Sequence, residues 1–195
     1  MQSGESTVGI FCIENWAGDL RSRSSVKPLL DFVATEFGVR YIHQRISSLE
    51  ELDLYMDRWT NLDTYEVGYL ALHGTPGKVC VGNESMTVRE LLDRTWDAPE
   101  PWTIDLTGKT LYFGSCSTFA RSEAFADACK VTGARLTCGY RRSVPWDDGA
   151  AFEILLFSAL AHYDSPFDAL RSLQRRHGSF IERLGFDWMP RRGRR

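Results

Sequence analysis

The stretch EVGYLALHG, residues 66–74, is a mostly apolar run that ends at a histidine and a glycine. A second run of this kind, KTLYFG at residues 109–114, is followed at once by Ser115, Cys116 and Ser117. Short apolar runs bounded by small or polar residues are typical of buried strands. The two stretches therefore predict two strands, each followed by a side chain capable of acid–base or nucleophilic chemistry.

Strand and helix patterns alternate on both sides of these two runs. Apolar runs at 7–13, 39–46 and 134–140 predict three further strands, and KVCVG at 78–82 predicts an edge strand of a small hairpin. Helical spacing predicts helices over 26–37, 48–59, 87–94, 120–131, 148–162 and 166–183. Strands joined through single helices imply parallel crossovers. We expect an α/β fold of three layers, with a mainly parallel central sheet flanked by helices.

Three helix starts carry capping signals. Ser24 or Ser25 is placed to cap the helix at 26–37, whose first turn tolerates Pro28. The pairs Ser48–Glu51 and Thr87–Glu90 have the spacing of capping boxes.

Length and composition favour one domain over residues 1–195, because 195 residues are too few for two sizeable cores. Within it, residues 75–107, which include the loop WDAPEPW, form an excursion predicted to lie beside the active site. Residues 185–195 are predicted to be a basic C-terminal tail, with four arginines in the last five positions.

Charge and cysteine usage exclude several function classes. A net charge of -3 gives no reason to expect nucleic acid or an anionic membrane as partner. No run reaches the length of a membrane span, and the N-terminus lacks the basic and apolar regions of a signal peptide. The five cysteines are odd in number, widely spaced and without a C-x-x-C pair, so we expect a reducing cytoplasm and neither disulfides nor a zinc cluster.

His73 and Cys116 are the residues expected to carry chemistry. Sequential strands usually lie side by side, and ligands bind beyond the carboxyl ends of parallel strands, so the two side chains are expected to meet there. An imidazole can take the proton of a thiol and later protonate a leaving amine. A helix beginning soon after Cys116 would add a favourable dipole. The backbone N–H groups of Gly74 and Cys116 could hold an oxyanion.

The other cysteines and histidines fit structural roles. Cys12, Cys80, Cys129 and Cys138 lie within apolar runs, and His43, His162 and His177 are interpreted as surface or core residues. Dinucleotide, P-loop, zincin and G-x-S-x-G motifs are not found in the sequence.

The blocks YLALHG and LYFGSCST resemble the His-Gly and Cys blocks of clan CD cysteine peptidases, which include caspases, metacaspases, separases, gingipains and the bacterial CHAT proteins. The likeness continues through residues 125–160 and is nearest to the CHAT and metacaspase-like group. It implies a caspase-like fold, with His73 as base, Cys116 as nucleophile, and Gly74 and Cys116 as oxyanion donors. It also implies that no metal or organic cofactor is needed, although some resembling peptidases use calcium.

Three features depart from this resemblance. The caspase pentapeptide Q-A-C-x-G is replaced by GSCST. Metacaspases carry an aspartate two residues before the cysteine, where this chain has Gly114. The connection from Cys116 to the strand at 134–140 is short, so the chain resembles the single-piece CHAT and metacaspase arrangement rather than a cleaved caspase.

Substrate contacts are expected from the loops after the first and fifth predicted strands. The candidates are Glu14 and Asp19 in the first loop, Trp146, Asp147 and Asp148 in the second, and Trp16 as a further pocket wall. An aspartate in the pocket would select a basic substrate residue, which is the expectation we adopt, and Arg141 or Arg142 would select an acidic one. The competing interpretation makes Asp147 or Asp148 a helix N-cap.

Together these features predict a cysteine endopeptidase that hydrolyses peptide bonds of a protein or peptide substrate through an acyl-enzyme on Cys116. One alternative is a catalytically silent caspase-like module that binds a ligand or a regulatory protein partner. A second is a different hydrolase or transferase that uses the same cysteine.

Overall fold

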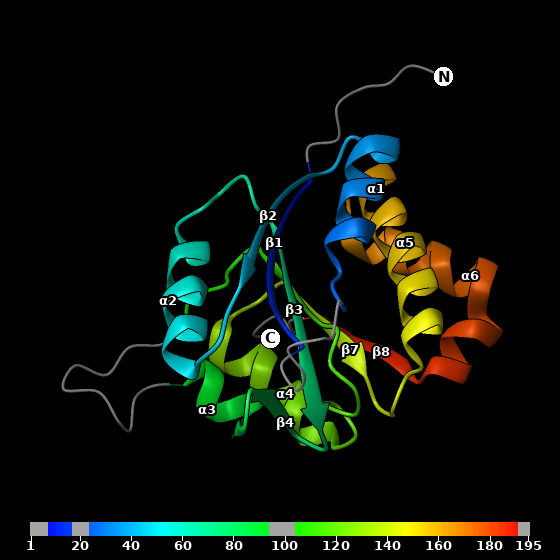
Figure 1. The fold of residues 1–195 in the computed structure, drawn as a ribbon. Helices are drawn as coiled ribbons and strands as arrows, with labels where there is room; N and C mark the ends of the chain where they lie inside the picture. The colour runs from blue at the N-terminus through cyan, green and yellow to red at the C-terminus, as the bar shows by residue number, and fades with distance from the viewer. Residues whose placement is uncertain (1–7, 17–23, 94–103, 191–195) are drawn as a thin grey trace, which may run out of the picture.

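The computed structural model describes residues 8–16, 24–93 and 104–190 and is built around one central sheet (Figure 1). In spatial order the six strands of the main path are β2 (Arg40–Arg45), β1 (Gly9–Asn15), β3 (Val67–Thr75), β6 (Thr110–Phe113), β7 (Leu136–Tyr140) and β8 (Phe186–Pro190). The first five are parallel to one another, and β8 is antiparallel to β7. The predicted, mainly parallel sheet is therefore confirmed.

Helices cover both faces of this sheet. One layer consists of α1 (Lys27–Phe37), α5 (Trp146–His162) and α6 (Pro166–Leu184), and the other of α2 (Leu49–Thr60), α3 (Val88–Leu92) and α4 (Ser122–Thr132). Alternate residues of β1 serve the two faces: Ile10 and Cys12 join the core under α1 and α5, while Phe11 and Ile13 join the core on the side of α2. This arrangement confirms the predicted three layers.

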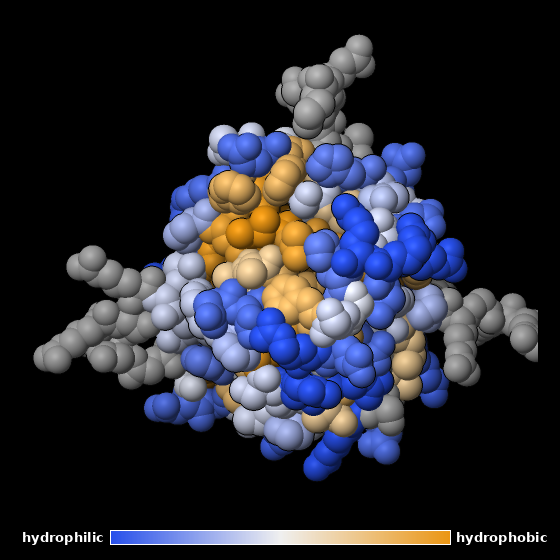
Figure 2. Space-filling view, turned by 90° about the vertical axis from the view of Figure 1, so that its right-hand side faces the viewer, coloured by the Kyte–Doolittle hydropathy of each residue, from blue (hydrophilic) through white to orange (hydrophobic). Residues whose placement is uncertain are grey.

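The outer surface of the α5–α6 layer is mostly hydrophilic, with an apolar area beside it (Figure 2). Helices that bury one face and expose the other produce such a surface. Of the helices in the described ranges, none is both long enough and apolar enough to span a bilayer.

β3 runs further than its sequence run suggests. Its parallel pairing with β6 ends at Leu70 and its pairing with β1 at Leu72. The strand then continues to Thr75 and pairs with the hairpin strand β4 (Lys78–Val81), which in turn pairs with β5 (Glu84–Thr87). His73 lies opposite Cys80 in this ladder. It is therefore a paired residue within β3 and not the residue at which the strand ends. The predicted hairpin is confirmed.

The two predicted capping boxes differ in their completeness. The Thr87 hydroxyl accepts from the Glu90 N–H, and the Glu90 carboxylate accepts from the Thr87 N–H, so this box is complete. Ser48 likewise accepts from the Glu51 N–H. The Glu51 carboxylate, however, accepts from the N–H and hydroxyl of Ser47, one residue earlier than predicted.

Two other helix starts correct the sequence expectations. α1 begins after Val26, so neither Ser24 nor Ser25 occupies its N-cap position, although Pro28 lies in its first turn as expected. The Ser25 hydroxyl still accepts from the N–H of Lys27, the first helical residue, at 3.1 Å. α5 begins after Pro145, earlier than predicted, and Asp147 and Asp148 therefore lie within its first turn instead of capping it. Carboxylates in a first turn still interact favourably with the helix dipole.

β8 was not predicted. Gly185 ends α6 with a left-handed φ of 64°, and the chain then turns back along β7, where Trp188 pairs with Cys138. The predicted basic tail is therefore wrong for residues 186–190, while residues 191–195 lie outside the described ranges. The short segment FDWMP lacks clear alternation, which is why its sequence did not indicate a strand.

Candidate active site

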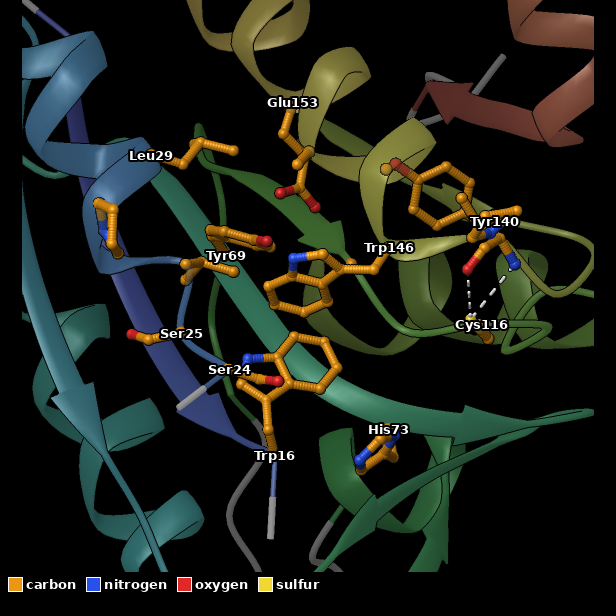
Figure 3. Close-up of a pocket in the computed structure, with 17 residues that line it drawn as sticks. Trp16, Ser24, Ser25, Leu29, Tyr69, His73, Cys116, Tyr140, Trp146 and Glu153 are labelled. Atoms are coloured by element: carbon orange, nitrogen blue, oxygen red, sulfur yellow. Dashed lines mark hydrogen bonds between the residues drawn. The ribbon is translucent and has the colours of Figure 1, made fainter. Parts of the chain in front are cut away.

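A pocket of about 710 Å³ contains both predicted reactive residues, His73 and Cys116, in its lining (Figure 3). Its volume is typical of ligand sites. Most of its walls are apolar or aromatic, and they come from the start of α1, the start of α5 and the segment before α5. The lining includes Trp16, Val26, Leu29, Val144, Pro145 and Trp146.

The segment after β6 carries Cys116 away from the sheet in a tight turn. The Gly114 N–H donates to the Leu70 carbonyl at 3.0 Å, which extends the contact with β3 by one residue beyond β6. Two residues later comes Cys116, and Ser117 then adopts a left-handed φ of 57°. A non-glycine residue in this region is uncommon and occurs often at functional sites.

Hydrogen bonds tie this turn to the hairpin that carries His73. Within the turn, the buried Ser115 hydroxyl accepts from the Thr118 hydroxyl at 2.9 Å, and the Thr118 hydroxyl also lies 3.3 Å from the Lys78 carbonyl of the hairpin. The Gly77 N–H, at the tip of the hairpin, donates to the Thr118 carbonyl at 3.1 Å. Two segments far apart in sequence are thereby fixed relative to each other.

Gly74 is packed directly against the Cys116 turn. A Cβ at this position would lie 2.4 Å from the Cys116 carbonyl oxygen and 2.5 Å from Thr118 Oγ1. Only glycine allows the backbone next to His73 to approach the backbone of Cys116 this closely.

Replacing Gly74 with alanine should therefore displace the turn and destabilise the protein by about 1–3 kcal/mol, as overpacked substitutions do. Chemical denaturation would measure the loss. Gly149→Ala is the matched control, because a Cβ there has its nearest neighbour at an ordinary 3.5 Å and the position is helical. Equal stability of the Gly74→Ala and wild-type proteins would contradict the close packing.

The Cys116 sulfur lies against the backbone of Val144. The Val144 N–H donates to Sγ at 3.4 Å, and the thiol can donate to the Val144 carbonyl at 3.7 Å, as the dashed lines in Figure 3 mark. A backbone N–H in this position can hydrogen-bond a thiolate. α4 begins only at Ser122, so the expected dipole contribution is remote, and Val144 is the donor that sequence reasoning missed.

His73 is exposed and packs edge-on against Trp16, with ring centroids 5.1 Å apart. Trp16 in turn contacts Trp146 at 5.0 Å, so both predicted wall residues line the pocket together. Among the hydrogen bonds of the described residues none joins His73 to Cys116. Catalytic pairs without substrate are often longer than a formed hydrogen bond.

Glu14, a predicted substrate contact, is a buried residue that forms hydrogen bonds within the protein. It is fully buried, its carboxylate contacts His43 Nε2 at 2.5 Å, and it accepts from the Val26 N–H at 2.7 Å and the Ser25 hydroxyl at 2.9 Å. Burial would raise the pKa of Glu14, but these hydrogen bonds outweigh burial and hold the pKa below its ordinary value. Glu14 is not among the lining residues; it anchors the start of α1, which forms one wall.

The predicted aspartates also lie outside the pocket lining. Asp148 forms a bidentate pair with Arg183 of α6, with a shortest distance of 2.6 Å, and Asp147 is exposed. Early entry into α5 turns both away from the pocket, so this part of the prediction is corrected. Arg141 pairs with Asp187, and Asp19 lies outside the described residues.

The described part of the excursion at 75–107 does not contribute to the pocket lining, and for residues 94–103, which lie outside the described ranges, the predicted position beside the site stays a prediction. None of its described residues, 75–93 and 104–107, lines the pocket. Its described residues approach the site through β4, where Cys80 pairs with His73, and through Gly77, which donates to Thr118 of the Cys116 turn. The loop WDAPEPW lies outside the described ranges.

Glu153, one helix turn beyond the predicted substrate residues, is the ionisable group that sequence reasoning missed. It is 6% exposed, lies in the pocket lining, and accepts a hydrogen bond from the Tyr112 hydroxyl at 2.9 Å. Burial raises its pKa to about 7, although Tyr69 and Tyr112 lower it in part. The Tyr69 hydroxyl lies near the carboxyl but outside hydrogen-bonding geometry.

Within the described ranges, no three or more His, Cys, Asp or Glu side chains gather as a metal site requires. Four of the five cysteines, Cys12, Cys80, Cys116 and Cys138, are free thiols.

Comparison with known proteins gives a family and a fold. A sequence profile of the "Family of unknown function (DUF6642)" matches residues 7–189. No curated protein matches the sequence. Among solved structures, the crystal structure of the Drosophila initiator caspase Dronc is similar with a TM-score of 0.53 and 15% identity, covering 94% of this chain and 78% of that chain. At this identity the likeness establishes a caspase-like fold and nothing finer.

Proposed function

Since this chain belongs to the family of unknown function DUF6642 and has a caspase-like fold, we propose that it is a cysteine peptidase with His73 and Cys116 as its catalytic pair. The observation that carries the proposal is that one pocket is lined by an imidazole from β3 and a thiol from the segment after the neighbouring strand β6. The resemblance of its sequence blocks to CHAT and metacaspase-like peptidases supports the same assignment.

The proposed reaction begins with proton transfer from Cys116 to the His73 imidazole. The thiolate attacks the peptide carbonyl carbon, a C–S bond forms, and the carbonyl oxygen becomes an oxyanion. The Gly74 and Cys116 N–H groups are the proposed donors to that oxyanion, because their backbones are in close contact. The C–N bond then breaks, and the imidazolium gives its proton to the leaving amine.

Water completes the cycle. It attacks the thioester carbonyl while His73 accepts its proton, the C–S bond breaks, and the thiolate is reprotonated as the acid product leaves. The atoms and charges balance with peptide and water as the only reactants. Free thiols at four described cysteines fit the proposed cytoplasmic, reducing location.

Thiol labelling tests the assignment of the nucleophile. Iodoacetamide at neutral pH should modify Cys116 about tenfold or more faster than Cys80, since an imidazole-activated thiol has a larger thiolate fraction. Cys80 is the internal control, because it is also partly exposed and lies opposite His73. His73→Ala should remove the difference, which peptide mass mapping would quantify.

A peptide-library screen tests turnover. We expect the wild-type chain to cleave peptides and the Cys116→Ala variant to cleave none. Equal labelling of Cys116 and Cys80, together with no cleavage, would overturn the peptidase assignment. That result would favour the alternative, a silent caspase-like binding module. This alternative is favoured by one observation: the Cys116 Sγ forms its hydrogen bonds with the backbone of Val144 and not with His73.

A further inference from the structure

The inner end of the pocket presents a carboxyl group that forms no ion pair with any of the described residues. Glu153 is buried in α5, and within the described residues no lysine, arginine or histidine forms an ion pair with it. In Figure 3 its carboxyl points toward the space between Tyr69 and Trp146. A buried carboxyl is costly unless it is neutral or paired, and a ligand with a positive group can supply the partner that the described residues do not provide.

A second acceptor lies beside this carboxyl. Tyr69 is fully buried in β3, and its hydroxyl is one of the buried side-chain atoms without a hydrogen-bond partner. Unpartnered buried hydroxyls are rare, and each one calls for an explanation. Both groups crowd the position of Gly114: a Cβ there would lie 3.2 Å from the Tyr69 oxygen and 3.3 Å from a Glu153 oxygen.

The walls favour a flat cation. Trp16 and Trp146 contact each other along the pocket, and both belong to its lining. Guanidinium stacks on aromatic faces, offers several N–H donors in one plane and loses less hydration than ammonium when it is buried. It can therefore donate to a carboxylate and a neighbouring hydroxyl oxygen together.

Resting on the proposed peptidase function, we propose that this pocket receives an arginine side chain of the substrate, with Glu153 as its counter-ion and the Tyr69 hydroxyl as a second acceptor. Cys116 lines the same pocket, so the peptide bond next to that arginine would lie at the sulfur. Glu153 replaces Asp147 and Asp148 as the residue that selects a basic substrate.

The proposal predicts that binding is linked to pH. The titratable groups that act on Glu153 or respond to it are Tyr69, Tyr112, Tyr140, Glu14 and Cys12, and none of them is cationic. With a free pKa of about 7, the carboxyl is mostly protonated at pH 6 and mostly ionised at pH 8. Affinity for a guanidinium should therefore rise about tenfold over this interval.

Calorimetry on Cys116→Ala protein measures this binding without hydrolysis. The probes are acetyl-arginine methylamide and its neutral isostere acetyl-citrulline methylamide. At pH 8 the arginine probe should bind at least tenfold more tightly, and the added Glu153→Gln substitution should abolish this preference. Glu153→Asp should retain part of it. Asp147→Asn, an exposed carboxylate of the same helix, is the matched control and should leave both affinities unchanged.

Equal binding of the two probes, or a preference for arginine that survives in Glu153→Gln, would overturn the inference. The peptidase proposal is judged separately. If the arginine probe binds through Glu153 but no peptide is cleaved, the pocket assignment stands and the peptidase assignment falls. If Cys116 cleaves peptides only after acidic or apolar residues, the peptidase assignment stands and the assignment of the pocket to an arginine side chain falls.

Discussion

Replacing Cys116 with alanine is expected to lower kcat for peptide hydrolysis by about 10⁴-fold or more, because the acyl-enzyme has no other nucleophile to form on. Removing the imidazole with His73→Ala should cost about 10²–10⁴-fold, the usual contribution of a general base. The rates would be measured with a fluorogenic peptide under saturating conditions.

The double variant gives the sharper test. Residues that act as one unit are not additive, so Cys116→Ala with His73→Ala should lose no more activity than Cys116→Ala alone. Cys80→Ser is the control for a neighbouring thiol, since Cys80 pairs with His73 across the β3–β4 ladder but does not line the pocket. If activity persists in Cys116→Ala and disappears in Cys80→Ser, the nucleophile is Cys80 and the assignment to Cys116 is wrong.

The stability of the chain is expected to fall between pH 4.5 and 7 through Glu153. Its pKa is about 7 in the folded protein against an ordinary value of 4.5. Below pH 4.5 the carboxyl is protonated in both states. As the pH rises toward 7, Glu153 ionises first in the unfolded chain, and this lowers the free energy of unfolding by about 3 kcal/mol. Above the folded-state pKa the carboxyl is ionised in both states, so the free energy of unfolding falls no further through this group.

Urea denaturation of the wild-type chain and Glu153→Gln at pH 5 and pH 8 would measure this loss. Glutamine keeps the size of the side chain but cannot ionise, so the wild-type chain should lose about 3 kcal/mol more than the variant between these two pH values. Glu14 contributes in the opposite sense, because its pKa is lowered, and its contribution is common to both proteins. A pH-independent difference between the two proteins would contradict the raised pKa.

The architecture was predictable because each buried strand and most helices carry a local signal. The run at 66–72 has apolar residues on both faces, as a central parallel strand requires, and β3 is buried from Val67 to Leu72. The Thr87–Glu90 box was predictable for the same reason, since both partners lie within one turn.

The pocket was only partly predictable, because its residues meet through tertiary packing. Trp16 and Trp146 were expected as walls from their positions in loops, and both line it. Glu153 lies inside an apolar helical segment, where a single carboxylate gives no sign of the cavity it faces. Metacaspases carry an aspartate two residues before the cysteine, and this chain has Gly114 at that position. A Glu153 oxygen nevertheless lies close to Gly114 in space, which the sequence alone does not indicate.

β8 protects one edge of the sheet. Its pairing covers β7, a strand whose residues are all buried and whose hydrogen-bonding groups would otherwise face outward. A chain cut before residue 186 would therefore expose a bare strand edge, which is a template for pairing with a second molecule. Proteolytic trimming or shortened expression at this end should accordingly produce self-association and precipitation, even though the pocket residues are all retained.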